Sequence, residues 1–408
     1  MLTVLMSMMG ANAFAQDIAV ENSQGKMIYY RYCNDGRELA VSKDDKNYGK
    51  AYSGDVIIPE EVTYMNRTRK VTAIGYSAFA CCFELTSLTL PNSINKIESR
   101  AFESCRKLRS LTIPDGVTSI GKLAFVNSGL TSVTIPSSVK TIDNEAFWNS
   151  GSLTSVTISN GVKTIGEKAF KDCKKLSSIT IPGSVEALGD YAFEGCSSLV
   201  SVNIEYGLTN IGYNTFSECS MLSSVTIPNS VTKISSCAFA LCEQLTSVTI
   251  PPSLKEIKDG AFIRCSKISA VHITDLAAWC KINFGSDANP LRYAHRLFLN
   301  GTEIKDIVIP EGVTSISKTA FAWLNNLNSL TLPKSITNIG GRAFQGSDIT
   351  TIYCNIVDPT KIFGKTSDSG TFSTNTFNNA TLYVPAGTIG KYQATEGWKD
   401  FIFIEEKK

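Results

Sequence analysis

The sequence has very little histidine and no excess of either charge. Only His272 and His295 occur among its 408 residues, and Lys plus Arg (39) nearly balance Asp plus Glu (37). Histidine is the commonest general base and metal ligand near neutral pH, so its scarcity argues against most acid–base and metal chemistry. The small net charge also lacks the basic character of nucleic-acid-binding proteins, and we expect no nucleic-acid partner.

Several chemical motifs are absent as well. The sequence contains no Cys-x-x-Cys pair and no Gly-x-Ser-x-Gly, Gly-x-Gly-x-x-Gly or His-Glu-x-x-His motif. These patterns mark zinc sites, hydrolase nucleophiles, dinucleotide sites and metalloproteases. Gly364-Lys365-Thr366 resembles the end of a phosphate-binding loop, but Pro359 stands where the first glycine of that loop is needed. We therefore expect no catalytic residue, no cofactor and no bound metal.

Long apolar segments are missing too. No stretch approaches the roughly 18 to 20 apolar residues that span a bilayer, so we expect no membrane span. A short apolar run over residues 2–10 precedes Ala13-Phe14-Ala15, which supplies the small residues that signal peptidase requires. This pattern predicts a signal peptide over residues 1–15, although the usual basic start is absent. The alternative is a frayed apolar N-terminus.

What the sequence does contain is a regular repeat, most visible as the dipeptide Ala-Phe. The step between successive repeat phenylalanines is 23 residues, except for one step of 22 and one of 59. The repeat phenylalanines are Phe79, Phe102, Phe125, Phe147, Phe170, Phe193, Phe216 (after Thr215), Phe239, Phe262, Phe321 and Phe344. Such a period indicates one stacked solenoid with a single interruption rather than two or three unrelated domains.

One repeat unit, residues 176–196, predicts the path of each coil. Residues 176–181 have the spacing L-x-x-L-x-L of a strand, and Pro182 ends that strand because it lacks the N–H that would extend the ladder. Val185 and Leu188 then bring a second apolar edge inward. A single coil buries too little apolar surface to offset the ordering of about 23 residues at roughly 1–2 kcal/mol each, so neighbouring coils must stabilise one another.

Three segments recur over about Val56 to Phe344, namely S-[VI]-T-I-P, V-x-x-I-G and A-F-x-x-C. This repeat resembles the BspA-like class of bacterial leucine-rich repeats. The resemblance implies an α/β solenoid dominated by β-structure. In full, this is a right-handed leucine-rich repeat superhelix of about twelve 23-residue coils, with a parallel β-sheet on its concave face and capped ends. Members of this class are taken to be secreted or cell-surface binding and adhesion proteins.

The expected domain organisation follows the repeat. Met27–Tyr32 and Glu38–Val41 read as a hairpin around Asn34-Asp35-Gly36, and a short helix is expected around residues 388–395. The predicted divisions are a signal peptide (1–15), an N-terminal β cap (16–70), a first repeat block (71–273), an insertion with a hairpin (274–305), a second repeat block (306–380) and a C-terminal cap (381–408).

Cysteine is abundant, with twelve residues, but most of it belongs to the repeat. Seven cysteines lie three residues after a repeat phenylalanine, namely Cys82, Cys105, Cys173, Cys196, Cys219, Cys242 and Cys265, and Ser128 and Ser150 take the same place in two coils. Stacked coils direct these side chains in parallel, so we interpret them as buried structural thiols. The other five cysteines could hold an isolated disulfide, which the sequence does not assign.

The interruption at residues 274–305 has two interpretations. A short helix is expected near Asp275, and Asn300-Gly301 between apolar runs predicts a hairpin. Its D-L-A-x-W-C and N-P-L segments resemble a module inserted in other proteins of the same class. The segment either restarts the solenoid after a bend, or presents Trp279, Tyr293, His295 and Arg296 as a ledge for a partner.

The outward face of the predicted strands is the best candidate for binding. Two neighbouring columns carry almost only hydroxyl side chains, Ser87 to Ser247 in one and Thr89 to Thr249 in the other. Further along, the columns change to Ala270, His272, Asp306, Val308 and Tyr353. The candidate binding residues are Thr134, Thr157, Thr180, Thr226, Thr249, His272, Trp279, Tyr293 and Tyr353. The alternative is a strand surface that only contacts water.

These observations favour a secreted or cell-surface, non-enzymatic binding or adhesion scaffold. It would act as a monomer and recognise an extracellular protein or glycan through the concave sheet and the insertion. The competing hypothesis is an envelope spacer without a specific ligand. An enzyme using Asp275, Asp287 and Glu303 of the insertion is disfavoured, because the catalytic motifs considered above are missing.

Overall fold

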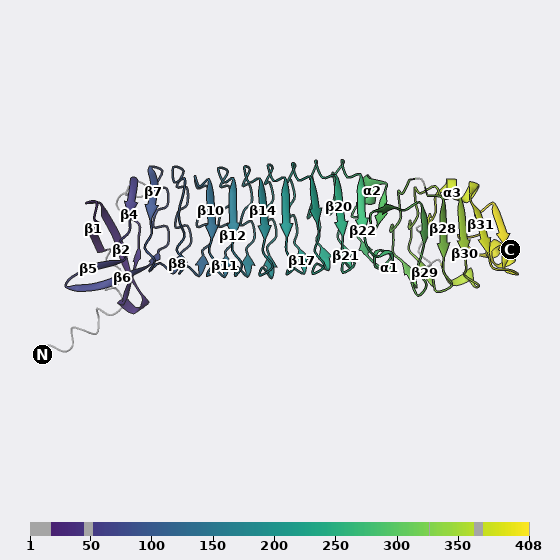
Figure 1. The fold of residues 1–408 in the computed structure, drawn as a ribbon, viewed down its shortest axis with the longest axis horizontal. Coiled ribbons are helices and arrows are strands. Elements are labelled where there is room, and N and C mark those ends of the chain that lie inside the picture. The colour runs from purple at the N-terminus through teal and green to yellow at the C-terminus, as the bar shows by residue number, and fades with distance from the viewer. Residues whose placement is uncertain (1–17, 45–51, 326, 363–369, 408) are drawn as a thin grey trace. The chain divides into compact units, whose positions relative to one another are not determined.

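The computed structural model describes residues 18–44, 52–325, 327–362 and 370–407. The predicted signal peptide and Gly364-Lys365-Thr366 lie outside these residues. The described chain forms two compact units. The first contains the residues up to Leu208 and Thr215–Cys219, and the second contains Thr209–Asn214 and the residues from Ser220 onward. Both units are β-solenoids, in which each coil adds strands to the preceding one (Figure 1).

The first unit begins with antiparallel strands. β1 (Ile18–Glu21) pairs with β2 (Met27–Cys33), and β2 pairs with β3 (Glu38–Val41), which confirms the predicted hairpin. β5 (Glu61–Tyr64) and β6 (Arg67–Ile74) form a second antiparallel pair. β6 also runs parallel to β3, so this sheet changes from antiparallel to parallel pairing where the repeats begin.

The shorter strands of the first unit continue that sheet without a break. Each has two residues, the second of which is a buried Ile or Leu. They are β8 (Lys96–Ile97), β9 (Ser119–Ile120), β11 (Thr141–Ile142), β13 (Thr164–Ile165) and β15 (Ala187–Leu188), and they follow β6 in this order. The second apolar edge predicted for each coil therefore consists of short strands that pair in parallel from one coil to the next.

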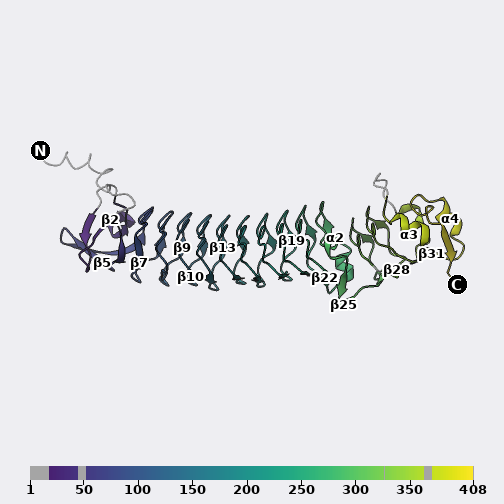
Figure 2. The same cartoon turned by 90° about the horizontal axis from the view of Figure 1, so that it is seen from above.

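The longer strands of the first unit lie on the other side of each coil (Figure 2). They are β4 (Gly54–Ile57), β7 (Leu85–Thr89), β10 (Ser132–Ile135), β12 (Ser155–Ile158), β14 (Ser178–Ile181) and β16 (Ser201–Ile204). They pair parallel as β4–β7, β10–β12 and β14–β16, and the register shifts only between Gly54 and Asp55 of β4. The longer strands are thus parallel, as predicted, and form separate paired groups within this unit.

One coil of the first unit has no longer strand at all. Residues 110–113 were expected to form one, but their backbone is irregular, although Leu111 and Ile113 still point inward. The next coil is the one with 22 residues, and a Cβ at its Gly129 would lie 2.1 Å from the carbonyl oxygen of Arg106. These two turns are therefore in direct backbone contact.

The second unit contains two series of parallel strands. Before and within the insertion the longer strands are β18 (Ser224–Thr226), β20 (Ser247–Ile250), β22 (Ala270–Ile273) and β24 (Leu297–Leu299), to which β25 (Thr302–Glu303) adds antiparallel. The shorter ones are β17 (Asn210–Ile211), β19 (Lys233–Ile234), β21 (Glu256–Ile257) and β23 (Asn283–Phe284). The pairing of β24 with β25 confirms the hairpin at Asn300-Gly301.

The rest of the second unit repeats this arrangement. The longer strands β26 (Asp306–Val308), β28 (Ser329–Leu332), β30 (Thr351–Cys354), β31 (Thr381–Val384) and β32 (Phe403–Glu406) form one sheet, and β27 (Ser315–Ile316) pairs with β29 (Asn338–Ile339). The helices are short: α1 (Leu276–Trp279), α2 (Leu291–Ala294), α3 (Thr374–Asn379) and α4 (Ile389–Ala394). α1 and α4 confirm the helices predicted near Asp275 and around residues 388–395.

A row of stacked rings fills the centre of each unit. Consecutive repeat phenylalanines from Phe79 to Phe216 have centroids 4.9–5.5 Å apart and nearly parallel planes. Tyr52 packs 4.7 Å from Phe79, and Phe372 stacks 5.3 Å from Phe344, so both rings extend the rows beyond the Ala-Phe pattern. Over the described residues the solenoid has about 14 turns, slightly more than the twelve predicted.

Each ring is held between two residues in the left-handed backbone conformation. Around Phe170 these are Lys168 (φ 56°) and Asp172 (φ 59°), and the same two positions have positive φ in the other repeat coils. Such a conformation costs about 1–2 kcal/mol per non-glycine residue. The N–H groups of Lys168, Phe170 and Asp172 donate to carbonyl groups of the following coil at 3.0, 2.8 and 2.8 Å. These bonds between coils offset the local cost.

The repeat cysteines form a ladder of hydrogen-bond donors. The thiol of Cys196 donates to the carbonyl oxygen of Phe170 in the preceding coil (3.2 Å). The thiols of Cys105, Cys173, Cys219 and Cys265 likewise donate to the repeat phenylalanine of the coil before them. Ser150 makes the equivalent bond to Phe125 at 2.7 Å. All twelve cysteines are free thiols, and the seven of the ladder are buried, which agrees with the predicted structural role.

Burial raises the pKa of five ladder thiols above their ordinary value of 9.0, to about 11 for Cys82 and about 12 for Cys196, and likewise upward for Cys105, Cys173 and Cys219. The unfolded chain therefore loses thiol protons at lower pH than the folded chain, so this contribution to stability is complete below pH 9 and is lost as the pH rises. We predict that the thermal midpoint falls between pH 8.5 and 11, as followed by circular dichroism.

The matched control for this prediction is the variant Cys105→Ser/Cys173→Ser/Cys196→Ser, since serine already takes the equivalent place in two coils of the same unit. The triple variant should show a smaller fall over the same pH range. Equal falls in the two proteins would contradict the assignment to the thiol ladder.

Candidate binding face

The outward side chains of the longer strands form the candidate binding face. In the first unit, Val133 and Ile135 of β10 are buried, whereas Ser132 and Thr134 between them are exposed. β12 and β14 repeat this alternation, and Thr134 lies beside Thr157 in the strand pairing. The structure therefore places the predicted residues Thr134, Thr157 and Thr180 on the surface.

The hydroxyl groups of this face differ from those of the column just before the strands. In that column Thr131 donates to the carbonyl of Arg109 at 3.1 Å, and Thr154 donates to that of Thr131 at 2.9 Å. Such bonds join one coil to the next. By contrast, the hydroxyls of Thr134, Thr157 and Thr180 make no hydrogen bond to any residue that the structure describes. They are available to an external partner.

A pocket of about 440 Å³ opens on this face where the coil at residues 110–113 lacks a strand. Its polar lining consists of Ser110, Thr112, Asp115, Ser132, Thr134, Ser137 and Ser159. The irregular coil therefore adds depth to a surface that is otherwise a flat strip of hydroxyls. Only Thr134 of the candidate residues belongs to this pocket.

In the second unit the same face changes from hydroxyls to rings. Thr226, Thr249, His272 and Phe298 are direct neighbours in the register of β18, β20, β22 and β24. The ring of His272 lies 4.9 Å from that of Phe298. Phe298 was not among the predicted residues, although its position between Leu297 and Leu299 places it on the outward side of a strand that continues the column of His272.

A charged pair adjoins these rings. The guanidinium of Arg296 lies 5.0 Å from the centre of the Phe298 ring and forms two hydrogen bonds of 2.8 and 2.7 Å with the carboxylate of Glu303. These bonds lower the pKa of Glu303 and raise that of Arg296. Because the guanidinium is fixed by both contacts, it adds a positioned cation to the aromatic part of the face.

A second aromatic group lies in the sheet that starts with β26. Val308, Thr331, Tyr353 and Tyr383 follow one another across this sheet, and the two tyrosine rings stack with centroids 5.4 Å apart. Val308 is 59% exposed and Tyr353 is 40% exposed. The predicted change of surface in the C-terminal part of the chain is confirmed, and Tyr383 extends it.

The ledge predicted on the insertion requires a correction. Trp279 is only 1% exposed, and its Nε1 donates to the carbonyl of Ala320 at 2.9 Å. Asn289 likewise donates to the carbonyl of Thr319 at 2.7 Å. The indole lies inside the unit because the insertion must bury an apolar side chain where the row of phenylalanines is interrupted. Trp279 therefore joins the insertion to the coil after it and offers no surface to a partner.

Tyr293 and His295 also have structural contacts, in different places. The hydroxyl oxygen of Tyr293 accepts the N–H of Arg264 at 2.9 Å, and Nδ1 of His295 lies 2.9 Å from the carbonyl oxygen of Trp323. Of the four residues of the proposed ledge, only Arg296 contributes to the outward face. The interpretation of the insertion as a continuation of the solenoid is the one that these contacts support.

The carboxylates of the insertion are engaged separately. Asp275 caps α1 through the N–H of Ala278 at 2.9 Å, Asp287 pairs with Arg292, and Glu303 pairs with Arg296. Within the described ranges, no three His, Cys, Asp or Glu side chains are grouped closely enough to hold a metal ion. None of the helices in the described part has the length and apolar composition needed to cross a membrane.

Comparison with protein families identifies the repeat. The model of the BspA-type leucine-rich repeat region matches residues 60–154, 140–269 and 294–393, in six copies. The chain belongs to the BspA-type leucine-rich repeat family. BspA-type proteins are typically secreted or exposed on the cell surface, and their repeat fold is typically non-enzymatic. No match is found among curated proteins.

Solved structures of similar fold come from several bacteria. A leucine-rich repeat protein of Bacteroides ovatus is 24% identical with a TM-score of 0.53, over 93% of this chain and 98% of that one. The T. pallidum leucine-rich repeat protein is 29% identical with a TM-score of 0.42, over 48% and 87%. The pneumococcal vaccine antigen PcpA is 20% identical with a TM-score of 0.43, over 96% and 99%.

The buried position of Trp279 gives a stability prediction for this BspA-type chain. Trp279→Ala should lower the free energy of unfolding by about 3–5 kcal/mol, because it removes a large buried side chain and its hydrogen bond to Ala320. Chemical denaturation followed by circular dichroism measures this change. Trp148→Ala is the control, since Trp148 is 36% exposed, and should cost less than about 1 kcal/mol. Equal costs would contradict the structural role of Trp279.

Proposed function

We propose that this protein is an exported, non-enzymatic scaffold that binds an extracellular protein or glycan through the outward face of its longer strands. The observation that carries the proposal is the unused hydroxyl groups of that face. Thr134, Thr157 and Thr180 offer donors and acceptors to a partner, whereas the neighbouring Thr131 and Thr154 bond to backbone carbonyls. Membership of a family whose proteins are typically secreted or surface-exposed supports the extracellular setting.

The aromatic part of the second unit supports the same proposal. His272, Phe298, Tyr353 and Tyr383 lie on the outward face, half-buried or exposed, and aromatic rings contribute strongly where proteins or sugars are bound. The two units thus provide hydrogen-bonding and stacking surfaces on the same type of strand. A partner that covers several coils would be held by many weak contacts rather than by one deep site.

Lysine substitution on the face tests this proposal. The variant Thr157→Lys/Thr180→Lys should reduce binding to a printed glycan array and to a panel of purified extracellular-matrix proteins at least tenfold, because two bulky cations replace neutral hydroxyls. The control is Thr164→Lys/Ala187→Lys, which places the same charges in the same coils on the shorter strands β13 and β15. Lysine occurs naturally in that column at Lys96 and Lys233.

Two outcomes would oppose the proposal. Binding that is equal in the two double variants would show that the outward face takes no part in it. If the folded, unmodified protein binds neither the glycan array nor the panel of matrix proteins, the alternative of a structural spacer is favoured.

Export has its own test. We predict that the protein recovered from outside the cytoplasm of a bacterial host begins at Gln16, because Ala13 and Ala15 provide the small residues before that bond. N-terminal sequencing or intact mass measurement determines the first residue. Recovery of the full chain from Met1, confined to the cytoplasm, would contradict this prediction.

A further inference from the structure

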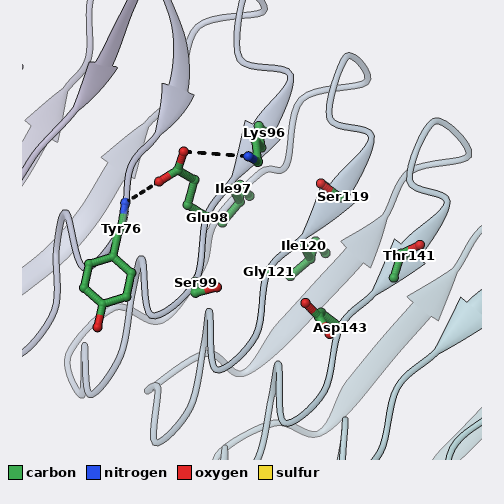
Figure 3. A pocket seen from close by; sticks show the side chains of 10 residues that line it. All are labelled: Tyr76, Lys96, Ile97, Glu98, Ser99, Ser119, Ile120, Gly121, Thr141 and Asp143. Atoms are coloured by element: carbon green, nitrogen blue, oxygen red, sulfur yellow. Dashed lines mark hydrogen bonds and ion pairs between the residues drawn. The ribbon is translucent and has the colours of Figure 1, made fainter. Parts of the chain in front are cut away.

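A second hollow lies among the shorter strands of the first unit, away from the face described above. It has a volume of about 410 Å³ and lies over β8, β9 and β11 (Figure 3). Its lining includes Tyr76, Lys96, Glu98, Ser119, Thr141 and Asp143. Pockets of about 300 Å³ or more are large enough to hold a small molecule or the end of a longer one.

A glycine forms the floor of this pocket. Glu98, Gly121 and Asp143 take equivalent positions in three successive coils, each directly after the buried Ile of a shorter strand. A Cβ at Gly121 would lie 2.6 Å from the backbone nitrogen of Ser99, so the close contact between coils excludes any larger residue. The two carboxylates therefore stand on either side of a position that carries no side chain. Their backbones are about 10 Å apart, since neighbouring strands are separated by about 4.8 Å.

The charges of the pocket disfavour an ionic ligand. Glu98 pairs with Arg31 at 2.5 Å and with Lys96 at 3.8 Å, so a cation would meet two positive groups there. An anion would meet the carboxylates of Glu98 and Asp143 instead. The Oδ1 of Asp143 accepts the N–H of Asn144 at 2.7 Å and keeps its remaining lone pairs for a ligand. A neutral ligand rich in hydroxyl groups fits this arrangement.

The remaining groups of the pocket are those that bind sugars. Tyr76 is 49% exposed, which leaves much of its ring open to stacking, and its backbone N–H is held by Glu98 at 2.8 Å. The hydroxyls of Ser119 and Thr141 make no hydrogen bond to another described residue and can donate to or accept from a ligand. A ring, two carboxylate acceptors and two hydroxyls thus surround a position without a side chain.

We infer that this pocket binds a neutral pyranose, such as the terminal sugar of a glycan. The carboxylates of Glu98 and Asp143 accept hydrogen bonds from sugar hydroxyls, and Tyr76 packs against the apolar side of the sugar ring. This site is separate from the outward face of the longer strands and gives the first unit a second binding surface.

Saturation-transfer difference NMR tests this inference with the methyl glycosides of glucose, galactose and mannose, and with glucosamine and glucuronic acid as charged probes. At least one neutral glycoside should give a signal, with a dissociation constant near 1 mM, and it should bind more tightly than both charged probes. Asp143→Asn and Tyr76→Ala should each weaken it at least tenfold. Thr141→Ala should weaken it, whereas Thr164→Ala, in the same column one coil further, should not.

Tyr213→Ala is the control for Tyr76→Ala, because Tyr213 takes the same coil position outside the pocket and is 38% exposed. The variant Thr157→Lys/Thr180→Lys should leave the signal unchanged, which separates this site from the proposed function. The inference is overturned if no neutral glycoside binds at millimolar concentration, if a charged probe is preferred, or if Asp143→Asn and Tyr76→Ala, both folded by circular dichroism, bind as tightly as the unmodified protein.

Discussion

The contact between a phenylalanine ring and the ring of the next coil is the interaction on which the rest of the structure depends. A coil of 23 residues has one such ring at its centre, and no other part of the same coil can cover both of its faces. The spacing of about 5 Å between rings is close to the separation of parallel strands, so rings and strands advance together. Both sets of strands and the turn around each ring follow from this shared spacing.

The turn around each ring shows how a costly local conformation is retained in coil after coil. Two residues per coil adopt positive φ, and several of them, such as Leu123 and Tyr191, are large. Within the coil of Phe170, the carbonyl groups of the two residues accept hydrogen bonds from Lys171 and Lys174. Their N–H groups reach the carbonyls of the next coil only in this geometry, so the backbone preference of one coil is overridden by hydrogen bonds to another. The same dependence on neighbours explains why Trp279 lies inside the insertion.

Much of the fold could be predicted because the repeat assigns each residue type to a place in the coil. The periodic phenylalanines gave the stacking direction, the cysteines gave a buried column, and the alternation Ser-Val-Thr-Ile gave the outward hydroxyls. The hairpin at Asn300-Gly301 followed from local turn preference alone. Each of these inferences rests on a pattern within one coil or on a residue with a strong backbone preference.

The errors and omissions concern contacts between coils. The loss of a strand at residues 110–113 was not predicted, because the residues of this coil keep the same apolar alternation as those of its neighbours. Trp279 was assigned to a surface because its partner Ala320 is distant in sequence. Tyr52 and Phe372 were missed because neither matches the repeated Ala-Phe dipeptide at the 23-residue period, although each supplies a ring at the end of a row. In the candidate sites, the pocket beside Gly121 depends on the absence of a side chain between two carboxylates.

The direction of the thiol bonds has a consequence for how such a chain can change its length. Five of the ladder thiols donate to a carbonyl of the coil before them, and none of the seven shares a covalent bond with another cysteine. Duplication or deletion of one whole coil therefore leaves the remaining thiols with equivalent acceptors and creates no unmatched disulfide partner. A repeat protein built in this way can gain or lose single coils in evolution. Its length can therefore change while the buried contacts of the remaining coils stay the same.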